Sequence, residues 1–97
     1  MELKIKAIHF DISEKLNAFI EKKAARLEKK VERATQLEVT LKVVKPETAK
    51  NKETQLHLYV PGGDLHAERV CDTFEEGVLE CIEAVLKQVE RYKEKNK

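Results

Sequence analysis

The sequence predicts an α+β domain in which a four-stranded mixed sheet is covered on one face by two helices. Four segments alternate apolar and polar residues, which is typical of strands that bury one face. Two longer segments repeat their apolar residues at the spacing of an α-helix. The order is β-α-β-β-β-α, so the first helix forms a crossover that favours a parallel pair, whereas hairpins join the later strands. The 97 residues suffice for a single domain, residues 1–97, with a modest core.

The first predicted strand is Glu2–Ile8, and the first helix follows it after a short turn. In the strand, Leu3 and Ile5 point to one face and the charged residues between them point to the other. Ser13 is a suitable N-cap because its hydroxyl can accept a hydrogen bond from the first helical turn. Apolar residues then continue at helical spacing, and we expect this helix to run to about Ala34.

Three further strands are predicted between the helices, at Leu37–Val44, Gln55–Val60 and Leu65–Val70. The polar segment Lys45–Glu53 contains a proline and is expected to be an exposed hairpin loop. The next connection, Pro61–Asp64, is a strong turn signal because it contains two glycines, which adopt positive φ without strain.

The second helix is predicted to follow a capping box formed by Thr73 and Glu76 and to run to about Lys95. Gly77 in its first turns costs up to about 1 kcal/mol relative to alanine, and nothing in the sequence explains it. The apolar face of this helix consists of Phe74, Val78, Cys81, Ile82, Val85, Val89 and Tyr92.

The first helix separates its charges by sign, which is unusual for an amphipathic helix. Opposite charges normally alternate on the wet face, because like charges four residues apart repel each other. Here the cations share one line and the acids share another, on either side of the apolar stripe. We therefore expect the basic line to face something anionic outside the protein. The basic line is Lys15, Lys22, Arg26, Lys29 and Arg33, and the acidic line is Glu14, Glu21, Glu28 and Glu32.

A second basic cluster lies at the end of the second helix, although the net charge of the chain is only +1. Residues 14–34 and 87–97 each carry a net charge of +3, and residues 64–83 carry −6, so the molecule is expected to be polarised. The plain alternative is that both clusters are solvated helix faces. Two basic helix flanks in one layer favour a surface that spans phosphates, and the scarcity of aromatic residues favours recognition of RNA shape and backbone. The candidate RNA-contacting residues are Lys22, Lys23, Arg26, Lys29, Lys30, Arg33, Lys87, Arg91 and Lys95.

The sequence gives little support for an enzyme, a cofactor or a metal. It contains no Gly-rich phosphate loop at a helix start, and its two cysteines lack metal-ligand spacing. His57 and His66 are expected on the outward face of neighbouring strands, where two histidines without a nearby carboxylate or cysteine make a poor metal site. Free thiols at Cys71 and Cys81 indicate a reducing compartment. With no apolar run of membrane-spanning length, the cytoplasm is expected.

The chain resembles the short ribosome hibernation-promoting factors, the family that includes the ribosome-associated inhibitor of translation. The resemblance covers almost the whole chain except the 45–53 loop. It departs from the family at Ala7, where glycine is frequent, and at Glu75–Leu79, which lacks the usual aromatic and aspartate. The segments that carry it are Leu3-x-Ile5, Asp11-Ile-Ser-Glu14, Leu16-x-x-Phe19-Ile20, Lys23-x-x-Arg26-Leu27-Glu28, Val39-x-Leu41-Lys42-Val43, Leu56-His57, Gly62-Gly63-Asp64-Leu65-His66-Ala67, Lys87-Gln88-Val89 and Lys93-x-Lys95.

The resemblance implies a layout like that of double-stranded-RNA-binding domains and a non-enzymatic function. The protein would bind the small ribosomal subunit and its rRNA through both helices, block the path of mRNA and tRNA, and silence idle ribosomes. It would be a monomer off the ribosome, and a second factor would be needed to form ribosome dimers. Two alternatives stay open: a general structured-RNA-binding module, and a protein-interaction or oligomeric scaffold that uses the outer sheet face around Lys42, His57 and Tyr59.

Overall fold

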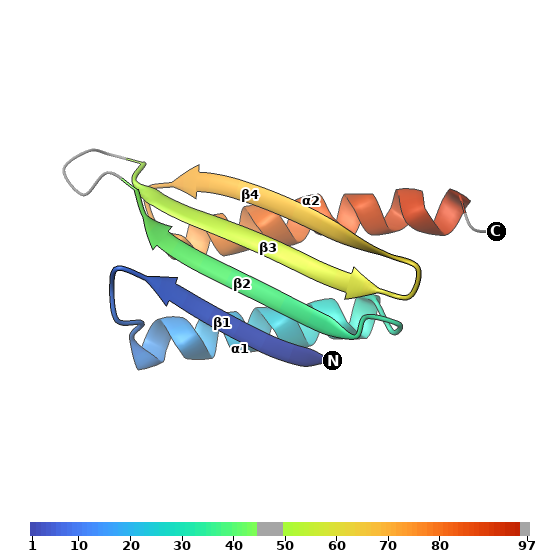
Figure 1. Cartoon of the computed structure of the whole chain (residues 1–97), viewed down its shortest axis with the longest axis horizontal. Helices are drawn as coiled ribbons and strands as arrows, with labels where there is room; N and C mark the ends of the chain where they lie inside the picture. The colour runs from blue at the N-terminus through green and yellow to red at the C-terminus, as the bar shows by residue number, and fades with distance from the viewer. Residues whose placement is uncertain (45–49, 96–97) are drawn as a thin grey trace.

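Over the residues that the structure describes, the protein consists of a four-stranded sheet and two helices, in the order β-α-β-β-β-α that the sequence predicts. The computed structural model describes residues 1–44 and 50–95. The strands lie side by side in the order β1-β2-β3-β4 (Figure 1). The β1–β2 pair is parallel and the other two pairs are antiparallel, so the mixed sheet is confirmed. The elements are β1 (Glu2–Ile8), α1 (Glu14–Lys30), β2 (Gln36–Val43), β3 (Lys52–Val60), β4 (Gly63–Cys71) and α2 (Phe74–Lys95).

Both helices lie on the same side of the sheet, behind the strands in the view of Figure 1. Every second residue of β2 and β3 points toward the helices, and these residues are buried over Leu37–Leu41 and Thr54–Val60. These side chains meet the apolar stripes of α1 and α2 in one core, because each layer has an apolar face that only the other layer can cover. No helix among the described residues is long and apolar enough to cross a membrane. The largest fully buried side chains are Ile20, Leu27, Leu37, Leu41, Leu56 and Leu58.

Both hydroxyl N-caps that the sequence predicts, Ser13 and Thr73, are present. The Ser13 hydroxyl accepts a hydrogen bond from the Leu16 amide at 3.1 Å, and the Thr73 hydroxyl accepts one from the Glu76 amide at the same distance. Each bond satisfies one of the backbone N–H groups that the first turn of a helix leaves without an intrahelical acceptor.

The first helix ends earlier than the sequence predicts. It stops at Lys30 instead of about Ala34, because the backbone of Val31 leaves the helical region with φ −125° and ψ 78°. Val31 and Ala34 are both buried, so the chain turns here to carry its apolar residues into the core and to enter β2. Arg33 therefore lies in a turn after α1, and the basic line on the helix is one residue shorter than expected.

The strands of the β3–β4 hairpin are longer than predicted. β3 begins at Lys52, within the segment that was expected to be loop, and residues 45–49 of that segment lie outside the described residues. At the other end, β4 already begins at Gly63. Val60 pairs with Gly63, so Pro61 and Gly62 alone form the turn, and Gly62 has the positive φ of 85° that the glycine there permits. As a consequence, Asp64 belongs to a strand and not to the turn.

Gly77 is explained by the close approach of α2 to β3. A Cβ atom at this position would lie 2.3 Å from Oγ1 of Thr54 and 2.9 Å from its Cβ. Thr54 is fully buried between the sheet and the helix, so it has no room to withdraw. Glycine at this position lowers helix stability, but it allows α2 to pack this close to the sheet.

We expect Gly77→Ala to destabilise the protein by about 1–3 kcal/mol, because overpacking outweighs the gain in helix propensity. Urea unfolding followed by circular dichroism measures the change. Gly63→Ala is the matched control, because nothing lies within 4 Å of a Cβ there, and it should leave stability nearly unchanged. If Gly77→Ala is as stable as the natural protein, the close approach does not require glycine.

Candidate nucleic-acid interface

The basic side of α1 lines a groove between the two helices. Lys23, Arg26 and Lys30 come from α1 and lie along one wall of this groove. The Lys23 ammonium also sits 5.4 Å from the centre of the Phe19 ring, a cation–π contact that holds its long side chain against the helix. Three cations spaced over two turns of helix therefore share one open channel.

The opposite wall of the groove comes from α2 and is mostly apolar. It contains Leu79, Ile82 and Leu86, together with the carboxylate of Glu83. Leu79 is 43% exposed, so this wall is open to solvent at that point. An apolar wall displaces water next to the lysines and the arginine, so their attraction for an anion is stronger than on a fully wet surface.

The acidic side of α1 faces away from the groove, toward β1. The Glu28 carboxylate pairs with the ammonium of Met1 at 3.1 Å, and Met1 leads directly into that strand. The Glu21 carboxylate accepts a hydrogen bond from the Asn17 amide at 2.6 Å on the same helix. The separation of charge along the sequence of α1 thus becomes a separation in space, with the cations toward the groove and the outer surface.

Lys87 and Arg91 lie on α2 but do not face the groove that Arg26 lines. They line a second hollow, on the side of α2 that faces β4, together with Gln88 and Arg69. Two carboxylates, Glu80 and Glu83, border the same hollow. The two basic clusters are therefore on one layer, as expected, but the body of α2 separates them and they do not form one basic groove.

The other candidate residues lie at the edges of this layer. Lys22 and Lys29 are exposed on α1, and Arg33 is exposed in the turn that follows the helix. Lys95 is the last residue of α2. Lys22, Lys29 and Arg33 extend the basic surface beyond the groove, along α1 and the turn after it.

Arg69 is a basic residue of this surface that the sequence reasoning missed. It pairs with Thr54 across β3 and β4, so it occupies a position whose neighbours point into the core. Because β4 is an edge strand, its side chain is exposed and reaches the hollow beside α2, where its Nη1 donates to the carbonyl of Glu68 at 2.7 Å. The sequence signal that would have revealed Arg69 is a basic residue at an inward-pointing position of an edge strand.

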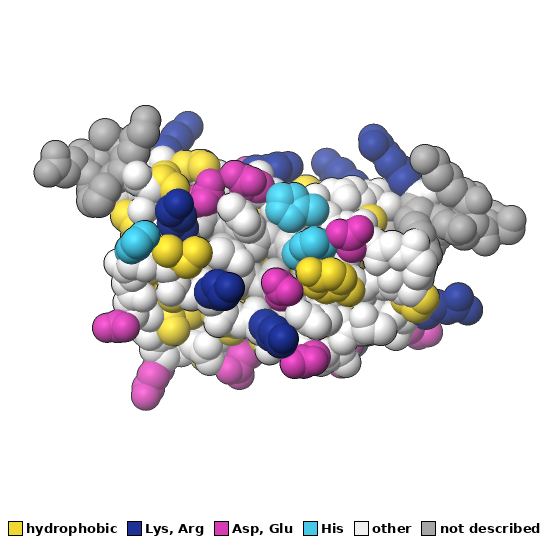
Figure 2. All heavy atoms as spheres, viewed as in Figure 1, with side chains coloured by type: hydrophobic (Ala, Val, Ile, Leu, Met, Phe, Trp, Pro, Cys, Tyr) yellow, Lys and Arg dark blue, Asp and Glu magenta, His cyan; other side chains and the backbone are white. Residues whose placement is uncertain are grey.

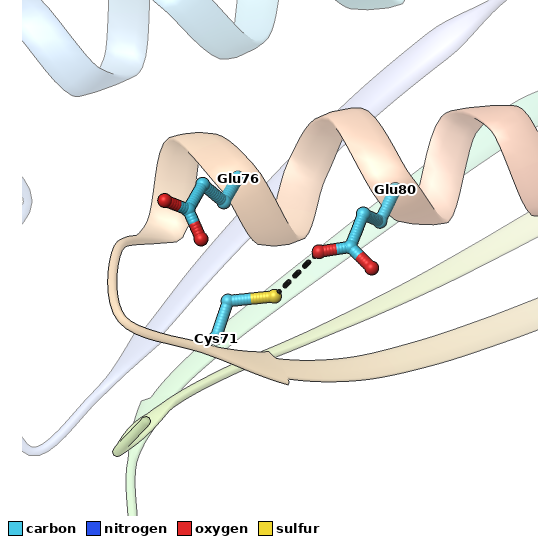
Figure 3. A group of neighbouring side chains, drawn as sticks. All are labelled: Cys71, Glu76 and Glu80. Atoms are coloured by element: carbon cyan, nitrogen blue, oxygen red, sulfur yellow. Dashed lines mark hydrogen bonds between the residues drawn. The ribbon is translucent and has the colours of Figure 1, made fainter. Parts of the chain in front are cut away.

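An acidic cluster at the start of α2 surrounds the thiol of Cys71 (Figure 3). The sulfur of Cys71 donates to Oε2 of Glu80 at 2.9 Å, and Glu76 lies beside them, so that the three donor atoms are within 4.8 Å of one another. Burial, reinforced by the carboxylates of Glu80, Glu76 and Asp72, raises the pKa of the Cys71 thiol to about 11. Since metals bind the thiolate, a thiol that keeps its proton in this way is a poor ligand.

The outer face of the sheet has a different character from the helix side. Figure 2 shows this face, on which histidines gather near the centre among side chains of both charges. His57 and His66 are direct partners across β3 and β4, as their outward alternation predicted, and their ring centres lie 5.7 Å apart. Acids outnumber bases on this face, so it is the less suitable side for a polyanion.

Comparison with known proteins gives one family, one relative by sequence and solved structures with the same fold. Residues 3–97 match the family described as Sigma 54 modulation protein / S30EA ribosomal protein. The chain is 32% identical over 97 residues to a ribosome hibernation promoting factor of Salmonella typhimurium strain LT2, covering 100% of this chain and 98% of the relative.

Two solved structures share the fold. A ribosomal subunit interface protein from Coxiella burnetii superposes with a TM-score of 0.82 at 20% identity, over 96% of this chain and 98% of the other. The N-terminal domain of Protein Y from Thermus thermophilus superposes with a TM-score of 0.78 at 20% identity, over 95% and 99%. At this identity the two structures establish the arrangement of strands and helices.

We expect both native thiols to react slowly with iodoacetamide at neutral pH. Burial also raises the pKa of Cys81 to about 11. Relative to an ordinary thiol with a pKa near 9, the thiolate fraction at pH 7.5 falls by about 100-fold. Mass spectrometry of alkylated peptides measures the two rates, and the urea-unfolded chain is the control.

The same shifts predict how stability depends on pH. The unfolded chain releases its thiol protons near pH 9 and the native protein keeps them to about pH 11, so stability should fall as the pH rises through this range. Rapid alkylation of native Cys71 at pH 7.5 would contradict both expectations.

Proposed function

The chain belongs to the Sigma 54 modulation protein / S30EA ribosomal protein family, and from this premise we propose that it binds the small ribosomal subunit through the basic surface of its helix layer and silences idle ribosomes. The family consists of ribosome hibernation factors, which are not enzymes. The bound rRNA would be that of the channel through which mRNA and tRNA pass. Occupation of this channel by a folded protein would exclude both ligands.

The separation of charge on α1 is the observation that carries this proposal. Lys22, Arg26 and Lys29 present their charges on the exposed side, and the Glu28 carboxylate is turned toward the N-terminus instead. Clustering of like charges destabilises an isolated helix. Binding of an anionic partner to these cations would explain why the chain keeps them together. Phosphate groups suit both side-chain types, because a guanidinium makes paired hydrogen bonds and an ammonium acts as a point charge.

The layer geometry supports an extended contact with RNA. The groove between the helices supplies one row of cations, and the hollow beside α2 supplies Arg69, Lys87 and Arg91 on the other side of that helix. Each phosphate that these groups neutralise releases condensed counterions, so affinity should depend steeply on salt. The outer sheet face is poor in net positive charge, which leaves only the helix side to approach the ribosome.

The wider properties of the protein follow from the same proposal. It would act in the cytoplasm, where ribosomes are, and it would be a monomer when it is not bound. Formation of ribosome dimers would require a second factor. A general affinity for duplex RNA is the second candidate function, because the same cations contact backbone and not bases.

Sedimentation of extracts from growing and starved cells tests the proposal directly. The protein should migrate with small subunits or whole ribosomes in starved cells. A protein found only in the soluble fractions under both conditions would exclude ribosome binding. Equal affinity of the purified protein for an unrelated RNA duplex would favour the general RNA-binding module.

Charge reversal on α1 should abolish ribosome binding at physiological salt without unfolding the domain, and the binding that returns at low salt measures the lost contacts. The variant combines Lys22→Glu, Arg26→Glu and Lys29→Glu, all of which are exposed and remote from the core. The slope of log Kd against log salt for the purified small subunit should decrease by about one for each phosphate that the variant no longer neutralises.

The matched control for this variant reverses two exposed lysines of β1, Lys4→Glu and Lys6→Glu, on the outer sheet face. The control should bind small subunits as the natural protein does. If the α1 variant also binds at normal strength, the basic line of α1 is only a solvated face.

Substitution of Arg69 separates the two basic clusters. Arg69→Ala removes a cation from the hollow beside α2 and leaves the groove of Lys23, Arg26 and Lys30 intact. We expect several-fold weaker binding of small subunits at moderate salt, comparable with the effect of Lys87→Ala, since each neutralised phosphate contributes similarly. Unchanged affinity for both variants would confine the RNA contact to α1.

A further inference from the structure

We propose that His57, Asp64 and His66 form a binding site for a divalent transition cation of the zinc class on the outer face of the sheet. This site lies on the opposite side of the sheet from the helices and is independent of the proposed ribosome contact. No metal was expected here from the sequence, because the two histidines had no carboxylate assigned beside them. The extension of β4 to Gly63 supplies that carboxylate, since it places Asp64 in the strand.

The sheet register brings the three side chains together. His57 on β3 is the direct partner of His66 on β4, and Asp64 precedes His66 by two residues on the same strand. Residues two apart on a strand point to the same face, and directly opposed residues of an antiparallel pair are nearest neighbours on that face. Two ligands on one strand and a third on its neighbour therefore converge from a rigid hairpin.

Two of the three donor atoms already touch, and the third ligand is the direct cross-strand neighbour of His57. Nε2 of His57 is in direct contact with Oδ2 of Asp64. A cation bound about 2.0–2.2 Å from each atom, at tetrahedral angles, needs them a little over ~3 Å apart. The Asp64 side chain is 55% exposed and can withdraw by that amount. The His66 ring is edge-on to His57 with ring centres 5.7 Å apart and is also exposed, and the proposal requires it to turn about its side-chain bonds so that a ring nitrogen reaches the cation.

A second layer of contacts orients His57 as a ligand. The Tyr59 hydroxyl lies 3.4 Å from Nδ1 of His57 and donates to Oε1 of Glu38 at 3.3 Å. The two rings stack with centres 4.3 Å apart and planes 16° from parallel. In its hydrogen bond with Asp64, Nε2 of His57 carries a proton, which a bound cation would replace. With the other proton on Nδ1, hydrogen bonds would then run from imidazole to phenol to carboxylate, and the lone pair of Nε2 would face the cation. A histidine whose second nitrogen is held in this way is typical of metal sites.

The charges and ligand types select the class of cation. One coordinating carboxylate leaves a dication with a net charge of +1, and Glu38 behind Tyr59 offsets the remainder. Two imidazoles and one carboxylate suit zinc, cobalt, nickel or copper ions better than magnesium or calcium, which prefer more oxygen ligands. Both thiols of the chain are buried, so neither contributes to a site on the exposed sheet face. A water molecule would complete four-coordination.

Calorimetric titration of the purified full chain with zinc chloride at pH 7.5 tests the site. We expect one equivalent to bind and the melting temperature to rise by about 5 °C at saturating zinc, because the cation binds only the folded hairpin. No binding of zinc by the natural protein at pH 7.5 would overturn the proposal.

The variants assign the ligands. His57→Ala and Asp64→Asn should each abolish measurable binding, and Tyr59→Phe should weaken it by about 10-fold, since it removes only the orienting contact. His9→Asn is the matched control because His9 is an exposed histidine with positive φ, 68°, that asparagine tolerates. It should bind zinc normally. Normal binding by both His57→Ala and Asp64→Asn would exclude this site.

Cobalt(II) in place of zinc distinguishes this site from the Cys71 cluster. Coordination by imidazole and carboxylate gives weak visible bands without the intense near-ultraviolet band of a thiolate ligand. We expect that spectrum for the natural protein and for Cys71→Ser alike. A thiolate band that disappears in Cys71→Ser would place the cation beside Glu76 and Glu80 and overturn the proposal.

Discussion

Coverage of only one face of the sheet by two helices is the constraint on which the other features of this protein depend. The inward residues of β2 and β3 have no partner except the apolar stripes of α1 and α2, so strand register and helix orientation are fixed together. A shift of one residue in β3 would expose Leu56 and Leu58 and bury His57. The close contact of Gly77 with Thr54 sets how deeply α2 sits on this core.

This constraint also decides which charges face outward. Because Leu16, Ile20 and Leu27 must face the sheet, the acids and bases of α1 are directed to opposite sides, toward β1 and toward the groove. The packing of α2 likewise places an apolar wall beside the groove. Lys87 and Arg91 lie instead on the side of α2 that faces β4. The helix layer therefore carries cations at several places, and the outer sheet face has no positive excess. Both result from the packing of the helices together with the order of charged residues in the sequence. The polarity of the molecule is therefore a property of the fold as well as of the composition.

The features that could be predicted from the sequence are those that one element determines alone. Alternation located the four strands, and the hydroxyls of Ser13 and Thr73 located both helix starts. The features that were missed depend on two elements at once. Gly77 is explained only by Thr54, and the end of α1 is set by the burial of Val31 rather than by a glycine or proline. The groove and the hollow also needed the structure, because only the packing of α2 between α1 and β4 turns the flank of Lys87 away from α1.

Two residues of the candidate sites were misjudged for related reasons. Arg69 was overlooked because inward register normally means burial, and only its position on an edge strand frees its side chain. Asp64 was assigned to a turn because a proline and two glycines precede it, although the strand pairing continues through it. In both cases the local pattern was correct, and the position of the residue within the whole sheet decided where its side chain lies.

Fold and function place different requirements on this chain. Structures with only 20% identity keep this arrangement at TM-scores of 0.78 and 0.82, because a patterned sheet and two amphipathic helices tolerate many exchanges of one apolar residue for another. The exposed side chains are not constrained by that packing. Segregation of charge on α1 costs helix stability and contributes nothing to the core, so packing alone does not account for it. The same reasoning applies on the opposite face, where stacked His57 and Tyr59 with Asp64 and Glu38 form a polar arrangement that the buried side of the hairpin does not need.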